Sequence, residues 1–208
     1  HGQGKFEEAE NFYRSVLKLQ PEHLNGNNNL GVVLYLQGKL EQASVYYKKT
    51  IELKPDLAEA YNNLGVVLQR LRKLKESETN YRQALVLKPN FVEVHNNLGN
   101  ILHDQARLEE AKASYKKAIE LKPDYAEAYN NLGNIFLKMK KLEEAVLNYR
   151  TAIDLEPAHA EAHNNLGITL QEFKRIEESE ISYRQAIKFK PSYAKAHINL
   201  GNLLYDQT

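Results

Sequence analysis

Residues 126–159 read AEAYNNLGNIFLKMKKLEEAVLNYRTAIDLEPAH, and this stretch, with its close copies along the chain, decides the fold. Its proline is one of six, and neighbouring prolines are always 34 residues apart. A leucine–glycine pair recurs with the same step. A fixed period of this length, with helix-forming residues between the breaks, is typical of stacked helical units rather than of a single core. The prolines are Pro21, Pro55, Pro89, Pro123, Pro157 and Pro191, and the pairs begin at Leu30, Leu64, Leu98, Leu132, Leu166 and Leu200.

Two amphipathic helices are predicted in each repeat, which we number from the third residue after a proline so that the next proline is position 32. Positions 4, 7, 8 and 11 share one face of a first helix, helix A, and include an invariant Leu and Gly. Positions 20, 24, 27 and 28 share one face of a second, helix B, and include an invariant Tyr between small residues. Glycine and the small residues allow close approach, and the tyrosine fills the space between the helices. Proline then ends helix B.

The repeat divides the whole chain into one array. Helix B alone is predicted at the start and helix A alone at the end, so the array is open at both ends. We predict a C-terminal half-repeat over 1–23, five full repeats over 24–57, 58–91, 92–125, 126–159 and 160–193, and an N-terminal half-repeat over 194–208.

Composition and charge exclude several classes of protein. The 208 residues are 42% hydrophobic and 26% charged, as in ordinary soluble proteins, and the formal net charge of +1 draws the chain neither to nucleic acid nor to an anionic membrane. The absence of cysteine excludes disulfides, zinc fingers and cysteine nucleophiles. The longest apolar stretch, 30–36, is far below the ~20 residues of a membrane helix. A cytoplasmic location is favoured, although the opening residues indicate that the natural start and any signal peptide lie upstream.

The chain resembles the tetratricopeptide repeat family, whose pattern it follows over all 208 residues without an insertion. The resemblance implies an all-α fold, a right-handed α-solenoid (superhelix) of helix-turn-helix units, whose concave inner surface is lined by helix A. Two positions depart from the family pattern. Asn27 replaces the usual aromatic residue at position 4, where we expect a weaker contact, and position 5 is asparagine in five repeats but Ile198 in the last.

The candidate binding site lies on the side of helix A opposite its packing face, at positions 2, 5, 6, 9, 12 and 13. Position 6 is asparagine in all six A helices. A carboxamide can form hydrogen bonds with the N–H and C=O of an extended peptide, whichever side chains the peptide carries. If A helices lie ~10 Å apart, each amide matches about three peptide residues that rise ~3.3 Å each. The predicted peptide-binding amides are Asn29, Asn63, Asn97, Asn131, Asn165 and Asn199.

Selectivity is expected from the variable positions 9, 12 and 13. The first two repeats offer an apolar patch, and the middle repeats offer a polar groove. The competing interpretation is that the asparagines bond within or between repeats and only support the fold. The other predicted peptide-binding residues are Asn100, Asn134, Tyr35, Arg70, His103 and Lys138.

We therefore predict a non-catalytic protein–protein interaction scaffold that binds an extended peptide or protein segment along its A helices. The asparagine-lined array also resembles the repeat domain of O-linked N-acetylglucosamine transferases, which implies, as one alternative, a segment that presents substrates to a larger glycosyltransferase. The other alternative is a self-assembling scaffold in which residues 1–20 of one molecule pack against 194–207 of the next, because interior repeats expose apolar stacking faces.

Other kinds of site are not predicted. Chaperone adaptors of the family hold a C-terminal carboxylate with basic residues at positions 2, 5 and 6, which here are mainly Glu and Asn. His159 and His163 have a metal-binding spacing, but the first lies near a turn and the second fills a packing position. Lys or Arg recurs at position 25 on the solvated side of helix B beside acids, which argues against nucleic acid. No catalytic set or cofactor motif is present.

Overall fold

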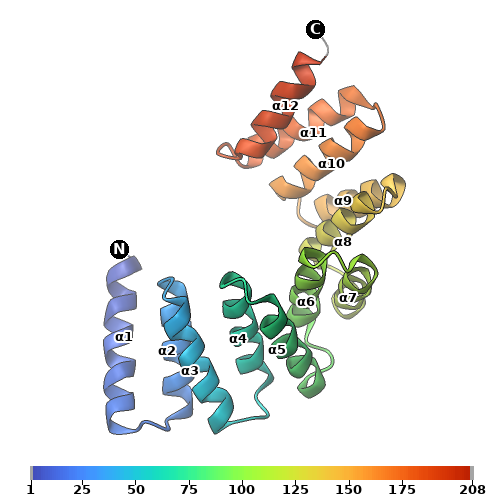
Figure 1. The fold of residues 1–208 in the computed structure, drawn as a ribbon. Coiled ribbons are helices and arrows are strands. Elements are labelled where there is room, and N and C mark those ends of the chain that lie inside the picture. Colours follow the sequence, from blue (N-terminus) through green and yellow to red (C-terminus); the bar gives the residue numbers. More distant parts are fainter. Residues whose placement is uncertain (1, 207–208) are drawn as a thin grey trace. The chain divides into compact units, whose positions relative to one another are not determined.

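The structure is a computed structural model that describes residues 2–206, and over this range every regular element is an α-helix (Figure 1). The predicted all-α solenoid of helix pairs is confirmed. Helices of type A are α2 (Leu24–Leu36), α4 (Ala58–Arg70), α6 (Val92–Asp104), α8 (Ala126–Lys138), α10 (Ala160–Glu172) and α12 (Ala194–Tyr205). Helices of type B are α1 (Gly2–Leu19), α3 (Leu40–Leu53), α5 (Leu74–Leu87), α7 (Leu108–Leu121), α9 (Leu142–Leu155) and α11 (Ile176–Phe189).

The chain divides into two compact units. Unit 1 spans residues 1–101 and unit 2 spans residues 102–208, and the division falls within α6. In each unit, an A helix packs against the B helix that follows it, and that B helix packs against the next A helix. Each helix pair therefore completes its core only with its neighbours, as expected for a solenoid.

In the pairs α2–α3, α4–α5, α8–α9 and α10–α11 a tyrosine ring of the B helix packs on a glycine of the A helix. Tyr81 and Tyr149 are fully buried, and a Cβ added to Gly65 or Gly133 would lie 2.6 Å from the Cε1 atom of the facing ring. The small residue at position 20 also contacts the facing helix. In α5 the Ser77 hydroxyl donates to the Gly65 carbonyl oxygen at 2.7 Å. These are the positions at which the sequence predicted close approach, and a side chain at Gly31, Gly65, Gly133 or Gly167 would overlap the facing ring.

The two connections in each repeat have different backbone requirements. Before each proline the chain leaves the helix, as at Lys54, where φ is −142° and ψ is 86°. Between helices A and B, position 15 adopts the left-handed conformation, with Gly38 at φ 77° and Arg72, Ala106, Lys140 and Lys174 at φ 58–61°. For a residue with a Cβ this conformation costs roughly 1–2 kcal/mol. The sequence alone did not reveal this requirement, because only one of the five residues is glycine.

Position 4 has a role that the sequence analysis missed. Asn27 is buried, and its Nδ2 donates to the carbonyl oxygens of Pro21 at 2.9 Å and His23 at 3.1 Å. Histidines at this position reach the same acceptor, since His163 Nε2 lies 3.0 Å from the Pro157 oxygen. The contact that we expected to be weaker at Asn27 is therefore replaced by hydrogen bonds to carbonyl oxygens of the turn between α1 and α2.

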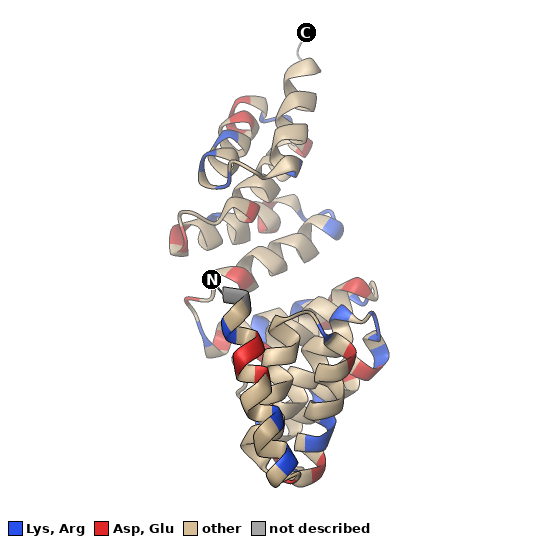
Figure 2. Cartoon of the chain, turned by 90° about the vertical axis from the view of Figure 1, so that its left-hand side faces the viewer, with Lys and Arg blue, Asp and Glu red and all other residues tan. Residues whose placement is uncertain are grey.

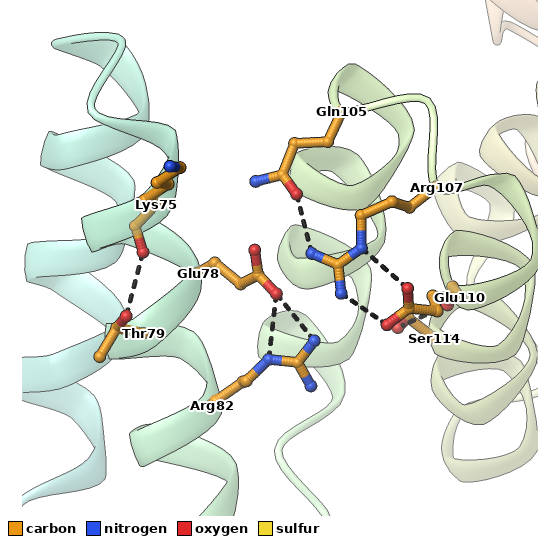
Figure 3. Close-up of polar contacts among 8 residues, drawn as sticks. All are labelled: Lys75, Glu78, Thr79, Arg82, Gln105, Arg107, Glu110 and Ser114. Atoms are coloured by element: carbon orange, nitrogen blue, oxygen red, sulfur yellow. Dashed lines mark hydrogen bonds and ion pairs between the residues drawn. The ribbon is translucent and has the colours of Figure 1, made fainter.

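Basic and acidic residues are interspersed along the ribbon of each unit (Figure 2). Many pair along their own helix. Arg82 Nη2 lies 2.7 Å from Glu78 Oε1, and Arg107 Nη2 lies 2.6 Å from Glu110 Oε2 (Figure 3). Such exposed pairs contribute about 0–1 kcal/mol each, so they solubilise the B helices rather than hold the fold together. The basic residues at position 25 are exposed, as expected for a solvated face.

None of the helices in residues 2–206 combines the length and the apolar character that a membrane span requires.

A Gly65→Ala substitution tests the tyrosine–glycine contact. The added Cβ overlaps the Tyr81 ring, so we expect a loss of ~1–3 kcal/mol, typical of overpacking. Gly201→Ala is the matched control, because nothing lies within 4 Å of its added Cβ and alanine favours a helix by roughly 0.5–1 kcal/mol. Urea unfolding followed by circular dichroism measures both. A Gly65→Ala chain as stable as the Gly201→Ala chain would contradict the packing argument.

An ion cluster gives unit 1 a pH dependence. Glu10 accepts hydrogen bonds from Lys39 Nζ and Arg14 Nε, both at 2.8 Å, and joins α1 to the turn before α3. The Lys39 hydrogen bond, with that of Arg14, lowers the pKa of the Glu10 carboxyl from 4.5 to about 2. Because the folded pKa lies below the unfolded one, the stabilisation is present above pH 4.5 and is lost as the pH falls toward 2.

We expect Glu10→Gln to reduce stability at neutral pH. We also expect the stability of the variant to fall less steeply than that of the unmodified chain between pH 4.5 and about 2. Thermal unfolding at a series of pH values measures the effect. Glu52→Gln is the control, because Glu52 pairs only with Lys49 on the surface. Equal pH profiles for the Glu10→Gln variant and the unmodified chain would show that the cluster does not stabilise the unit.

Candidate functional site

In unit 2 the asparagines at position 6 of α10 and α12 bond to the preceding A helix. Asn165 Nδ2 lies 3.1 Å from Asn130 Oδ1 and 3.0 Å from Asn134 Oδ1. Asn199 Nδ2 donates to Asn164 Oδ1 at 2.9 Å. The amide at position 6 of one repeat therefore donates to the amide at position 5 of the repeat before it, and this ladder joins successive A helices.

The same bond occurs in unit 1, where Asn97 Nδ2 donates to Asn62 Oδ1 at 3.2 Å. The competing interpretation is thus correct for Asn97, Asn165 and Asn199, whose Nδ2 atoms make these bonds. Each position-6 side chain remains half-buried, and a carboxamide has two N–H groups and an acceptor oxygen. The ladder uses part of this capacity and holds the amide in a fixed orientation.

Position 5 corrects the predicted inner surface. Asn96, Asn130 and Asn164 are buried, although the sequence analysis placed this position on the exposed side of helix A. They lie where adjacent A helices meet and act as acceptors for the ladder, as Asn130 and Asn164 do. The accessible face of the A helices is therefore narrower, with position 2 and position 13 exposed and positions 6 and 9 half-buried.

The variable positions 9 and 12 serve the core as well as the surface. Tyr149 Oη donates to Asn134 Oδ1 at 2.8 Å, and Tyr183 Oη donates to Gln171 Oε1 at 3.0 Å. Burial raises the pKa of these tyrosine hydroxyls, and a buried hydroxyl needs a partner. Asn134, predicted only as a peptide-binding residue, thus has its oxygen bonded to Tyr149. The signal in the sequence was the invariant tyrosine, whose hydroxyl required an acceptor.

The remaining predicted residues lie on the A helices as expected. In unit 1 the Arg70 guanidinium stands 5.0 Å from the centre of the Tyr35 ring of the preceding repeat. In unit 2 His103 is half-buried, and burial, followed by the Lys138 charge, lowers the pKa of its imidazole. The Lys138 side chain is exposed, and Asn29, Asn63, Asn100 and Asn131 are half-buried.

An open pocket of about 270 Å³ lies between α10 and α12. Amides line it beside two isoleucines, and it carries one acid and one base on position 2 of the two helices. Its residues are Glu161, Asn164, Asn165, Ile168, Tyr193, Lys195, Ile198 and Asn199. Sequence reasoning predicted only Asn165 and Asn199 of this set. The available signal was Ile198, which interrupts the asparagines at position 5 and is 61% exposed.

The two histidines with metal-binding spacing are engaged in the turn before α10. His159 Nδ1 accepts from the Ala162 N–H at 3.3 Å and caps the helix, while His163 stacks on Phe189 with ring centres 5.5 Å apart. Within residues 2–206 no group of three or more His, Asp or Glu side chains is arranged to hold a metal ion.

The geometry defines a class of protein: a solenoid of antiparallel helix pairs with a tyrosine–glycine core and an amide-lined A-helix surface. Profiles described as TPR repeat match residues 31–71, 73–106, 99–140, 133–172 and 175–207, and tetratricopeptide repeat profiles match 57–88 and 1–23. The chain belongs to the tetratricopeptide repeat family. A comparison with curated protein sequences finds no significant match.

Several solved structures share the fold. YrrB, described as a TPR protein with an unusual peptide-binding site, is 24% identical, with 88% of this chain and 95% of YrrB covered and a TM-score of 0.68. PilF from Pseudomonas aeruginosa is 24% identical, with 98% and 87% covered and a TM-score of 0.77. A chain of the APC/C hetero-tetramer Cut9–Hcn1 is 17% identical, with 97% of this chain and 40% of that chain covered and a TM-score of 0.83. Tetratricopeptide arrays are protein–protein interaction scaffolds and are generally non-catalytic. Membership of the family assigns this general role to the chain and no particular ligand.

Proposed function

We propose that the A helices of this scaffold bind an extended peptide, and that the pocket between α10 and α12 is a principal contact. The observation that carries the proposal is the composition of that pocket. The carboxamides of Asn165 and Asn199 are held in place by the ladder, beside the apolar side chains of Ile168 and Ile198. Amides orient a peptide backbone, and the isoleucines provide a surface that a peptide side chain buries.

The free energies of hydrogen bonding and of apolar burial assign different roles to the asparagines and the isoleucines. A hydrogen bond contributes about 0.5–1.5 kcal/mol net, and part of the amide capacity is already used within the ladder. Full burial of an isoleucine contributes roughly 1.5–3 kcal/mol, and Ile198 is 61% exposed before binding. The amides therefore fix the register of the peptide, while apolar contact supplies most of the affinity. YrrB, which has the same fold, is described as having a peptide-binding site, which supports the proposal.

An Ile198→Asn substitution tests this function. Asparagine occupies position 5 in the other repeats, so the fold tolerates it, but the apolar contact is removed. Peptides selected from a displayed library of random sequences are synthesised and their affinity is measured by fluorescence polarisation. We expect affinity to fall ~10-fold, which corresponds to 1.4 kcal/mol. Ile181→Asn is the control, because Ile181 is 58% exposed on helix B.

Asn165→Ala is expected to weaken the same peptides, with the fold checked by circular dichroism. The proposal is wrong if the library yields no binder, or if the selected peptides bind equally well to the Ile198→Asn and Asn165→Ala chains.

A second candidate function, self-assembly, is favoured by an open contact on α12. Nothing lies within 4 Å of a Cβ added at Gly201, whereas at Gly167, one repeat earlier, the Tyr183 ring lies at 2.6 Å. Leu204 beside it is 38% exposed, whereas Leu203 is buried. The matching tyrosine register on α1 is Tyr13, 34 residues before Tyr47, and Phe12 next to it is 66% exposed.

We propose that α1 of a second copy packs on α12 and places Tyr13 against Gly201. Of the segments predicted from the sequence for this contact, 1–20 and 194–207, residues 1 and 207 lie outside the described range. The contact joins two different surfaces, so it extends into a chain of molecules rather than closing as a symmetric dimer.

Gly201→Ala tests the contact. Its added Cβ would overlap the Tyr13 ring of the second copy, just as a Cβ at Gly167 would overlap the Tyr183 ring. Analytical ultracentrifugation over a range of concentrations is expected to show weaker association for Gly201→Ala and for Phe12→Ser than for the unmodified chain. Gly4→Ala is the control, because nothing lies within 4 Å of its added Cβ and it is outside the tyrosine register. A strict monomer at high concentration would exclude this assembly.

A further inference from the structure

The asparagine ladder is open between α2 and α4. The counterpart of the Asn97–Asn62 bond would join Asn63 to Asn28, but within residues 2–206 no donor reaches Asn28 Oδ1, which is buried without a hydrogen-bond partner. Asn28 Nδ2 instead lies 3.4 Å from Asn29 Oδ1. Asn63 is half-buried and makes no side-chain hydrogen bond within that range.

An unpaired buried acceptor destabilises a protein, but Asn28 Oδ1 lies below the surface, where a bound peptide does not reach it. The Asn63 carboxamide beside it in the register retains both its N–H groups and its oxygen for a ligand. The α2–α4 step therefore offers more free backbone-binding capacity than the steps at Asn97, Asn165 and Asn199, where the ladder is closed.

The surroundings of this opening are apolar. Position 9 is Val32 on α2 and Val66 on α4, whereas it is Asn134 on α8. Both valines are half-buried, and Leu36, one turn beyond Val32, is 54% exposed. A peptide side chain that lies against this surface must be apolar to gain free energy from contact with it.

A single unpaired positive charge borders the apolar surface. The Arg70 guanidinium stacks on the Tyr35 ring at 5.0 Å, and among the described residues no carboxylate forms an ion pair with it. The acid on the same helix, Glu59, is paired with Lys88 at 2.9 Å, so its charge is compensated. A stacked guanidinium keeps its N–H edge available for a carboxylate.

An extended peptide whose backbone edge faces the amides directs its side chains alternately to the two sides. Residues i and i+2 therefore project to the same side, ~6.6 Å apart. One such side chain reaches Val32 and Val66 while the other reaches the guanidinium of Arg70, whose long aliphatic stem spans the remaining distance.

We infer that the α2–α4 surface selects extended peptide segments that present an apolar side chain and, two residues away, a carboxylate. The inference rests on the proposed function and specifies its ligand in unit 1. The backbone of the segment hydrogen-bonds with the Asn63 carboxamide, the apolar side chain contacts Val32 and Val66, and the carboxylate pairs with Arg70.

The test titrates the isotope-labelled full chain with capped seven-residue peptides that carry Leu at the third position, Glu at the fifth, and Ser or Gly elsewhere. Matched peptides replace Leu by Ser or Glu by Gln. Nuclear magnetic resonance is expected to show shifts of the Asn63 side-chain amide with the Leu–Glu peptide. Each replacement is expected to weaken binding at least ~5-fold, of the order of a hydrogen bond to a charged group or a partly buried side chain.

Chain variants assign the two contacts. Arg70→Gln is expected to remove the preference for Glu over Gln while leaving the Gln peptide unaffected, a coupling that a merely structural role would not produce. Val66→Asn, which installs the residue of position 9 in α6 and α8, is expected to remove the preference for Leu over Ser. Arg72→Gln, an exposed arginine two residues beyond Arg70, is the control.

The inference is overturned if the Arg70→Gln chain still prefers the Glu peptide, or if the Leu–Glu peptide moves resonances of α10 and α12 but none of α2 and α4. In that case library-selected peptides that bind near Ile198 leave the proposed function intact. If no peptide of either kind binds, the proposed function and this inference both fail.

Discussion

The contact of a tyrosine ring with a glycine is the constraint on which the rest of this structure depends. Because the Tyr81 ring occupies the space that a Cβ of Gly65 would need, helices A and B approach until ring and backbone touch, and their separation is fixed. The same contact recurs at Tyr47, Tyr149 and Tyr183 with the glycines that face them. Since each helix pair completes its core only with a neighbour, this local distance repeats along each unit and sets the register of the A helices.

The fixed register allows asparagine to serve two purposes. Adjacent A helices bring position 6 of one repeat within hydrogen-bond distance of position 5 of the one before, as at Asn199 and Asn164. The bond uses one N–H group and orients the remainder of the amide. A side chain that supports the fold thereby keeps hydrogen-bonding capacity for the proposed peptide, so the two interpretations of the asparagines are compatible. Where the bond is not formed, at Asn28 and Asn63, the capacity for a ligand is larger.

Differences among repeats then give the array its individual character. The tyrosine hydroxyls need acceptors, and Asn134 or Gln171 supplies them, so polar residues at positions 9 and 12 are partly committed to the core. Valine at the same position in the first two full repeats leaves an apolar surface beside Arg70. A repeat protein of this kind varies its ligand contacts only at positions that its core does not require. The family defines the scaffold, and these few positions define the proposed ligand.

The sequence by itself determined the helix pairs and their core positions, because a 34-residue period repeated along the whole chain ties proline, Leu-Gly and tyrosine to backbone geometry. It also identified the amides at position 6. It did not determine the hydrogen-bond partner of each amide, the burial of position 5, or the bond from Asn27 to Pro21. These features depend on distances between parts of different repeats. The open step at Asn28 was decided by tertiary structure alone, since Asn28 and Asn63 are the same residues in the same register as Asn62 and Asn97, which are bonded. The sequence marked Ile198 as an exception at position 5, but only the structure shows the pocket beside it.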